Sequence, residues 1–122
     1  MDERLSRLIE QIRLYSFSVT GMKDGIVSMI PLEQIFYFDS VENKTYLYVE
    51  KDVYQCDKKL YELEQLLKET TFVRISKSCI LNAEKVTEVK AQFNGRLEVK
   101  LLNHEKILVS KHYIKEFKEK FK

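Results

Sequence analysis

Apolar and polar residues alternate with a period of two along most of this chain, which is the pattern of strands with one buried face. Short, uniformly apolar runs stand between the alternating segments and favour strands buried on both faces. We therefore predict strands over residues 15–20, 26–30, 35–40, 45–50, 53–56, 89–93, 97–101 and 107–109, and a further strand that starts at Phe72, ends in a polar corner at 76–78 and is followed by a short apolar run up to Asn82.

Glycines and polar residues separate these segments and predict turns. The stretch from Gly21 to Gly25 separates the first two strands, and residues 41–44 form a polar loop. Asn94-Gly95 is a strong signal for a two-residue hairpin turn, because both residue types accept a positive φ angle. Asn103-His104 predicts a second tight turn, with the asparagine at positive φ.

Three segments have helical spacing instead. The first covers residues 3–13, where one face carries Leu5, Leu8, Ile9 and Ile12. The second begins after Asp57, a suitable N-cap residue, and has an apolar stripe of Leu60, Leu63 and Leu67. The third follows Ser110, another suitable cap, and its inner face would consist of Tyr113, Ile114, Phe117 and Phe121. The predicted fold is mainly β, with one central helix and short terminal helices.

Length and composition describe an ordinary folded protein. A chain of 122 residues corresponds to one domain with a sizeable core, here residues 15–122 preceded by a helical segment over 1–14. Apolar residues make up 44% of the chain and charged residues 33%, which excludes a disordered segment. The first residues have no apolar core of a signal peptide, and no apolar run is long enough to span a membrane, so we expect a cytoplasmic protein.

The charge is distributed unevenly, although the net charge is only +2. Residues 1–71 contain 9 Lys and Arg against 13 Asp and Glu, a net charge of −4. Residues 72–122 contain 12 Lys and Arg against 6 Asp and Glu, a net charge of +6. A basic half suits a surface that faces a polyanion. On charge alone, however, lysines that solvate the outer faces of strands and of the last helix explain the pattern better.

The sequence contains no arrangement of residues that indicates catalysis. Cys56 and Cys79 lie in apolar segments without metal-ligand spacing, which is typical of buried, reduced thiols. Ser110 and His112 could be imagined as nucleophile and base, but they lack a third group and an oxyanion site. We expect no enzyme activity, no cofactor, no metal and no small-molecule substrate.

The most informative stretch is the strand-like segment over residues 72–82. It reads Phe-Val-Arg-Ile-Ser-Lys-Ser-Cys-Ile-Leu-Asn, a run with a polar, cationic corner at Ser76, Lys77 and Ser78. Further segments stand in a fixed order around it, namely Phe36-Tyr-Phe-Asp-Ser40, Asn43-Lys44-Thr45, Leu60-Tyr-Glu-Leu63, Asn94-Gly95-Arg96-Leu97 and Val109-Ser110-Lys111. In this order and spacing, residues 26–121 resemble the LytTR family of bacterial DNA-binding domains.

The resemblance implies a fold of small, packed antiparallel sheets and a role as a transcription regulator. Domains of this family press loops into successive major grooves of duplex DNA, usually on direct repeats occupied by two domains. Because too few residues precede Ile35 for a receiver domain, the chain resembles the stand-alone regulators of the family. The resemblance therefore implies duplex DNA, a second copy on DNA and a regulatory membrane protein as partners.

The resemblance also implies which residues contact DNA. Thr45, Lys77 and Lys111 match the family's reading positions, and their neighbours Lys44, Ser76 and His112 belong to the same polar segments. A lysine offers a point charge rather than the two-pronged contact of arginine with guanine, so both lysines suit phosphates. Two residues nearby have other expected roles. Asn82 should bind backbone groups, and Arg74 should contact either a phosphate or an acid on a neighbouring strand. The alternative is a β-rich protein-interaction module that does not bind DNA.

Overall fold

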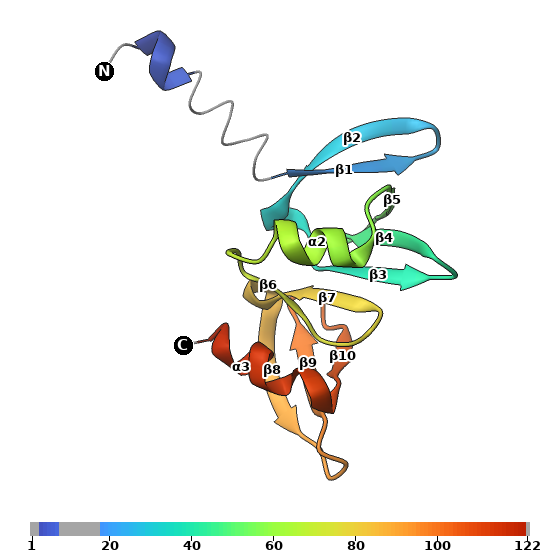
Figure 1. Cartoon of the computed structure of the whole chain (residues 1–122), viewed down its shortest axis with the longest axis vertical. Coiled ribbons are helices and arrows are strands. Elements are labelled where there is room, and N and C mark those ends of the chain that lie inside the picture. Colours follow the sequence, from blue (N-terminus) through green and yellow to red (C-terminus); the bar gives the residue numbers. More distant parts are fainter. Residues whose placement is uncertain (1–2, 8–17, 122) are drawn as a thin grey trace.

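Two antiparallel sheets dominate the computed structural model, which describes residues 3–7 and 18–121. The larger sheet has seven strands in the order β2-β1-β5-β4-β3-β7-β6, and the smaller has three in the order β10-β9-β8. They lie one above the other along the long axis of the molecule (Figure 1). The prediction of a mainly β fold of small packed sheets is confirmed.

The elements have the following bounds. The larger sheet contains β1 (Ser18–Lys23), β2 (Ile26–Pro31), β3 (Tyr37–Val41), β4 (Lys44–Tyr48), β5 (Val53–Cys56), β6 (Phe72–Arg74) and β7 (Cys79–Asn82). The smaller sheet contains β8 (Val86–Ala91), β9 (Leu97–Leu101) and β10 (Lys106–Val109). Outside the sheets lie the α-helices α2 (Leu60–Leu66) and α3 (Ile114–Glu119) and the 3-10 segments η1 (Leu32–Gln34), η2 (Ala83–Lys85) and η3 (Lys111–Tyr113).

The N-terminal prediction falls largely outside the described residues. Residues 3–7 are helical with exposed side chains, as expected for the start of the predicted helix. The remainder of that helix and the first residues of the predicted strand over 15–20 are not among the described residues. The described part of that strand is β1, which runs on to Lys23.

The first hairpin turn is tighter than predicted. Gly21 lies inside β1 opposite Ser28, and only Asp24 and Gly25 form the turn, with φ angles of 51° and 76°. A Cβ atom at Gly21 would lie 2.8 Å from the Cβ atom of Tyr54. Glycine at position 21 is therefore explained by close packing against β5 and not by a turn.

Two turns in the smaller sheet also differ from the predictions. Gln92 and Arg96 enclose a three-residue loop between β8 and β9, in which only Gly95 has a positive φ, of 82°. Between β9 and β10 the positive φ, of 70°, belongs to His104 and not to Asn103. Both loops place one left-handed residue after a tight turn, which is the common three-residue hairpin connection.

The side chains of successive residues on β3 and β7 enter two different cores, because side chains alternate across a strand. Phe38 and Ile80 belong to a cluster that includes the leucines of α2. Leu81 belongs to a second cluster, which contains Val99 of the smaller sheet and Phe117 of α3. The central strands are therefore covered on both faces, which fixes the position of the smaller sheet against the larger.

Both helices begin differently from the predictions. The N-cap of α2 is Lys59 and not Asp57; its backbone N–H donates to Oε1 of Glu62 at 2.9 Å. The predicted leucine stripe of α2 is confirmed as buried. Ser110 precedes η3 without a capping bond from its side chain, and Phe121 is half exposed although Phe117 is buried.

Asn82 has the structural role that the sequence predicted. Its amide nitrogen donates to the carbonyl of Ile35 at 2.9 Å, while its Oδ1 accepts from the Thr71 hydroxyl at 2.7 Å and the Glu84 N–H at 3.1 Å. These bonds satisfy buried backbone groups where β7 ends. Asn82 thereby ties three separate segments together.

Candidate nucleic-acid interface

Two backbone hydrogen bonds hold the predicted site segments side by side. The Ser40 N–H, at the end of β3, donates to the Ser78 carbonyl at 2.8 Å. The Ser110 N–H, before η3, donates to the Ile75 carbonyl at 2.8 Å. The corner between β6 and β7 therefore lies between the other two segments. We call the surface formed by residues 42–45, 75–78 and 110–112 the loop face; it follows the right-hand side of Figure 1.

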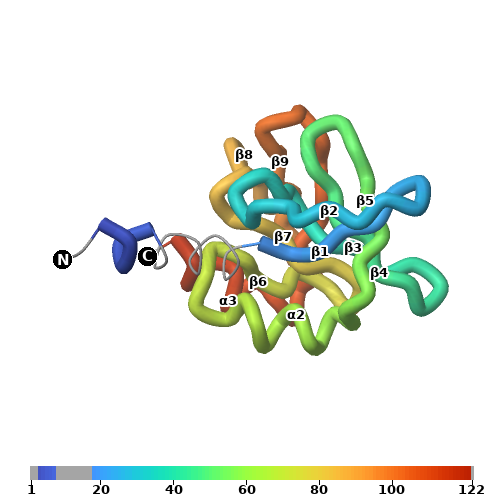
Figure 2. The backbone as a smooth tube through the Cα atoms, turned by 90° about the horizontal axis from the view of Figure 1, so that it is seen from above, coloured from blue at the N-terminus to red at the C-terminus, as the bar shows by residue number. Residues whose placement is uncertain are grey.

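The first segment of the loop face is the tip of the β3–β4 hairpin. Glu42 and Asn43 form a two-residue turn with φ angles of 51° and 66°, because the strands stay paired up to Val41 and Lys44. This tip projects away from both chain ends (Figure 2). The turn leaves Asn43 and Lys44 exposed.

The strand predicted from Thr45 onward is confirmed, so the position that the resemblance implies for DNA reading lies at a strand end and not in the exposed loop. Thr45 is part of β4, where it pairs with Ser40 on one side and Cys56 on the other. Its side chain is only 4% exposed. Strand pairing extends one residue further toward the tip on each strand than predicted, to Val41 and Lys44, and the exposed polar side chains beyond Thr45 are those of Asn43 and Lys44.

Arg74 organises the second segment, the corner at residues 75–78. Its Nε donates to the Ser76 carbonyl at 2.7 Å, and its Nη2 donates to the Lys77 carbonyl. Its Nη1 also lies 3.2 Å from Oε1 of Glu64 on α2. The acid expected as one partner of Arg74 is therefore present, but on a helix and not on a neighbouring strand. With the corner backbone held in this way, the Lys77 side chain is exposed.

Thr45 and Lys77 meet in one shallow pocket despite their different exposure. The pocket is lined by Ser40, Asn43, Thr45, Lys59, Leu60, Tyr61, Arg74 and Lys77. Lys59 closes one side of it, because its Nζ donates to the carbonyl of Asn43 at 2.9 Å. Arg74 and Lys59 are already bonded to backbone carbonyl groups, and Arg74 also to Glu64, so the exposed Lys77 is the cation of this pocket best placed to meet a phosphate oxygen.

The third segment is the start of η3, where Lys111 and His112 are both exposed. The stem of Lys111 lies over Gly95 of the β8–β9 loop. A Cβ atom at position 95 would come within 2.9 Å of Cε of Lys111. The Lys111 ammonium group is thereby held at the edge of the loop face that adjoins the smaller sheet.

One carboxyl group lies close behind the loop face. Burial raises the pKa of Asp39 on β3, while hydrogen bonds from the Ser78 side chain and the Ser40 backbone lower it to a smaller extent. The net shift is upward, so the charged form of Asp39 is disfavoured by its surroundings.

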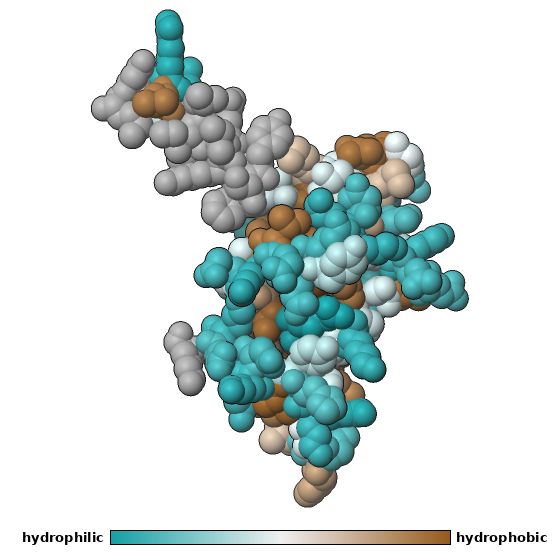
Figure 3. Space-filling view, viewed as in Figure 1, coloured by the Kyte–Doolittle hydropathy of each residue, from teal (hydrophilic) through white to brown (hydrophobic). Residues whose placement is uncertain are grey.

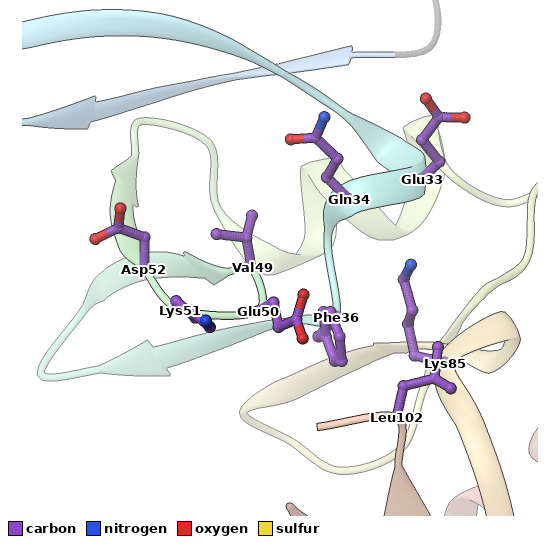
Figure 4. Close-up of a pocket in the computed structure, with 9 residues that line it drawn as sticks. All are labelled: Glu33, Gln34, Phe36, Val49, Glu50, Lys51, Asp52, Lys85 and Leu102. Carbon is purple, nitrogen blue, oxygen red and sulfur yellow. The ribbon is translucent and has the colours of Figure 1, made fainter. Parts of the chain in front are cut away.

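A second pocket contains none of the predicted site residues. It is lined by Glu33, Gln34, Phe36, Val49, Glu50, Lys51, Asp52, Lys85 and Leu102 (Figure 4). The Nζ of Lys85 lies 5.1 Å from the centre of the Phe36 ring. The side chains of this pocket carry both signs of charge and do not converge on one point, so the pocket has no evident ligand chemistry.

Two further findings concern the residues that the structure describes. They contain no group of three or more His, Cys, Asp and Glu side chains arranged to hold a metal ion. They also include no helix with the length and apolar character needed to cross a membrane.

Sequence reasoning missed Lys59 and Asn43 as parts of the site. Lys59 reaches the hairpin tip from a position 16 residues away, and no local pattern signals such a contact. Asn43 could have been identified, because asparagine at a two-residue turn is a standard signal for positive φ at a hairpin tip.

Most of the chain is similar to known proteins. The model of the LytTr DNA-binding domain family matches residues 26–122. The sensory transduction protein LytT of Enterococcus faecalis is 38% identical over 98 residues, which cover 80% of this chain and 40% of that protein. The transcriptional regulatory protein YpdB of Escherichia coli is 28% identical over 104 residues, or 84% of this chain and 42% of that protein.

A solved structure has the same fold. The LytTr DNA-binding domain of a methyl-accepting/DNA response regulator from Bacillus cereus matches with a TM-score of 0.79 at 23% identity, over 85% of this chain and 95% of that one. The chain spans about two fifths of the length of the curated relatives that it matches. Because the family model covers most of its residues, the chain belongs to the LytTR family and carries a DNA-binding domain of that family.

Proposed function

We propose that this chain binds duplex DNA in a sequence-dependent way and regulates transcription, with the loop face inserted into the major groove. The observation that carries this proposal is the hydrogen-bonded alignment of three polar segments on one side of the molecule. Each segment presents an exposed lysine, namely Lys44, Lys77 or Lys111. Cations spaced along one surface suit a phosphate backbone.

We assign the lysines mainly to phosphates and the shorter polar groups to bases. A lysine has a single charge without fixed direction, whereas a base edge is recognised by directional donors and acceptors. Asn43 and His112 carry such groups beside Lys44 and Lys111, and Ser76 carries one beside Lys77. Thr45 would act at the wall of the pocket, where a single hydroxyl group can bond to one phosphate or base atom.

Binding to direct repeats would require two copies in the same orientation on one duplex. The DNA partner also favours a cytoplasmic location, and a regulatory membrane protein stays a proposed partner on the basis of the family resemblance alone. In this proposal the chain acts by binding, without catalysis or a cofactor.

A second candidate function, docking to another protein, is favoured by one specific observation. Met22, Ile26, Val27 and Met29 of the β1–β2 hairpin are all exposed. Brown surface lies beside the turn of this hairpin near the top of Figure 3, whereas hydrophilic side chains cover the right-hand side at the level of the loop face. Exposed apolar patches commonly mark protein contacts. The hairpin forms one edge of the larger sheet, whereas β7 and β6 form the other edge and β5 separates β1 from β4, so the two functions use different parts of the surface.

Selection from a library of genomic DNA fragments tests the proposal. We expect enrichment of a shared sequence at both low and moderate salt, with affinity that falls steeply as salt rises. Recovery of fragments without any shared sequence at either salt concentration would contradict sequence-dependent binding. Loss of binding altogether would leave the protein-docking function as the better account.

A further inference from the structure

The loop face does not end at Lys111, because the β8–β9 hairpin continues it toward the lower end of the molecule in Figure 1. Hydrogen bonds within the hairpin connect the residues of its tip, residues 92–96. The Gln92 N–H donates to the Arg96 carbonyl at 3.0 Å, and the Gly95 N–H donates to the Gln92 carbonyl at 3.2 Å. The Arg96 N–H donates to Oδ1 of Asn94 at 3.1 Å.

The tip is in direct contact with the loop face. A Cβ atom at Gly95 would lie 2.9 Å from Cε and 3.6 Å from Nζ of Lys111. The lysine that we assign to DNA is therefore seated on the hairpin tip. A duplex that contacts Lys111 must also pass close to residues 93–96.

The side chains of the tip have the right chemistry for that position. Residues 90–96 include Lys90 and Arg96 and no acidic residue. The nearest acid along β9, Glu98, accepts a hydrogen bond from Gln92 at 3.1 Å and lies 3.9 Å from Nζ of Lys106. Glu98 also lies opposite Lys90 in the β8–β9 ladder, whereas the exposed Arg96 forms no ion pair with another described residue.

Phe93 is the most exposed large apolar side chain among the described residues, at 112% of its reference area. A protein-docking patch normally groups several apolar side chains, but polar and charged residues surround this one at the tip. A single ring next to cations suits the groove of a nucleic acid, where apolar side chains pack against sugars and base edges.

We propose that the tip of the β8–β9 hairpin is an additional DNA-contacting element, in which Arg96 binds a backbone phosphate and Phe93 packs against the sugars of the adjoining groove. The inference rests on the proposed function, since it extends the surface that contacts DNA. If the tip contacts DNA, the protein covers a longer stretch of duplex than the loop face alone would cover.

The test compares Arg96→Gln and Phe93→Ser on two duplexes that share one selected site. The long duplex extends past the site on both sides, and the trimmed duplex ends at the site. Lys106→Gln is the matched control, because it removes an exposed cation at the opposite end of β9 and β10. Lys77→Ala serves as the control for the proposed function itself.

On the long duplex we expect Arg96→Gln to reduce the salt slope of binding by about 0.9, the value for one phosphate contact. Both tip variants should bind the long duplex roughly 3- to 10-fold more weakly than the wild type at moderate salt. On the trimmed duplex they should equal the wild type, and Lys106→Gln should match the wild type on both. A purely structural role of the tip would weaken binding to both duplexes equally.

The two possible failures are distinguishable. If the wild type binds and Lys77→Ala weakens binding, but the tip variants retain wild-type affinity for the long duplex, the additional contact is refuted while the proposed function stands. Equal weakening on the long and trimmed duplexes would also refute it. If the wild type binds no selected site, the proposed function itself fails.

Discussion

At the scale of single residues, the loop face separates lysines that are free to contact DNA from polar groups that hold the fold. Lys77 and Lys111 have exposed side chains on a backbone fixed by other residues. Asn82 and Arg74 instead use their side chains to satisfy backbone carbonyl groups. This division leads to opposite expectations for substitutions of the two groups.

We predict that Lys77→Ala and Lys111→Ala each weaken DNA binding by ~1–3 kcal/mol and leave the melting temperature nearly unchanged. Lys51→Ala is the matched control, because Lys51 is an exposed lysine in the β4–β5 turn, away from the loop face. Fluorescence anisotropy measures the affinity for DNA, and thermal unfolding measures the melting temperature. A lowered melting temperature in either variant would assign that lysine to the fold and not to the interface.

Asn82→Ala should destabilise the protein by about 2–3 kcal/mol, because it leaves buried donors and acceptors without partners. Asn103→Ala, in the β9–β10 loop, provides the comparison: its amide bonds only to the backbone and side chain of Glu105. Urea denaturation should show a much smaller loss for that variant. Equal losses would mean that the buried network around Asn82 contributes little to stability.

Asp39 gives a prediction about pH. Because burial raises its folded-state pKa above the ordinary value of 3.8, the folded state binds the proton more tightly than the unfolded state. The contribution of this group to stability is therefore present at low pH and is lost as the pH rises through its raised pKa. Asp39→Asn should be more stable than the wild type at neutral pH, and this advantage should shrink as the pH falls toward 4. Urea denaturation of both proteins across that pH range measures the difference in their free energies of unfolding. If the stability advantage of Asp39→Asn grew on acidification, the raised pKa of Asp39 would be contradicted.

At the scale of elements, the sequence predicted the strands and the leucine stripe of α2 well but placed several turns and caps incorrectly. Alternation reports which face of a strand is buried, so elements such as β9 could be found from local pattern alone. The burial of the Thr45 side chain was not evident from its polar neighbours, because it follows from the pairing of β4 with both β3 and β5. The contact of Lys59 with Asn43 joins distant segments, and no local pattern contains that information.

Lys59 provides the prediction at this scale, because it fastens the β3–β4 tip to the start of α2. Lys59→Ala should increase amide exchange at residues 42–44 and weaken DNA binding, since the tip must then be ordered when DNA binds. Lys59→Arg should restore both, because the arginine can still donate to the Asn43 carbonyl. Weakened binding without faster exchange at the tip would assign Lys59 to direct DNA contact instead.

At the scale of the whole molecule, the family and the overall architecture could be inferred from the order of short motifs, although none of those motifs is distinctive alone. The alignment of the three segments of the loop face could not be inferred from the sequence, because it depends on how the smaller sheet packs against β3 and β7. This packing involves Leu81, Val99 and Phe117. Two hydrogen bonds, from Ser40 to Ser78 and from Ser110 to Ile75, then set the order of the segments along the surface.

The central claim is that DNA binds along this one surface. Amide hydrogen exchange of the full chain, with and without a selected duplex, tests it most directly. We predict slower exchange at residues 42–45, 75–78 and 110–112 in the complex, and no change in the β4–β5 turn or the β1–β2 hairpin. Protection confined to the β1–β2 hairpin, or no protection at the three segments under conditions where the duplex is bound, would contradict the claim.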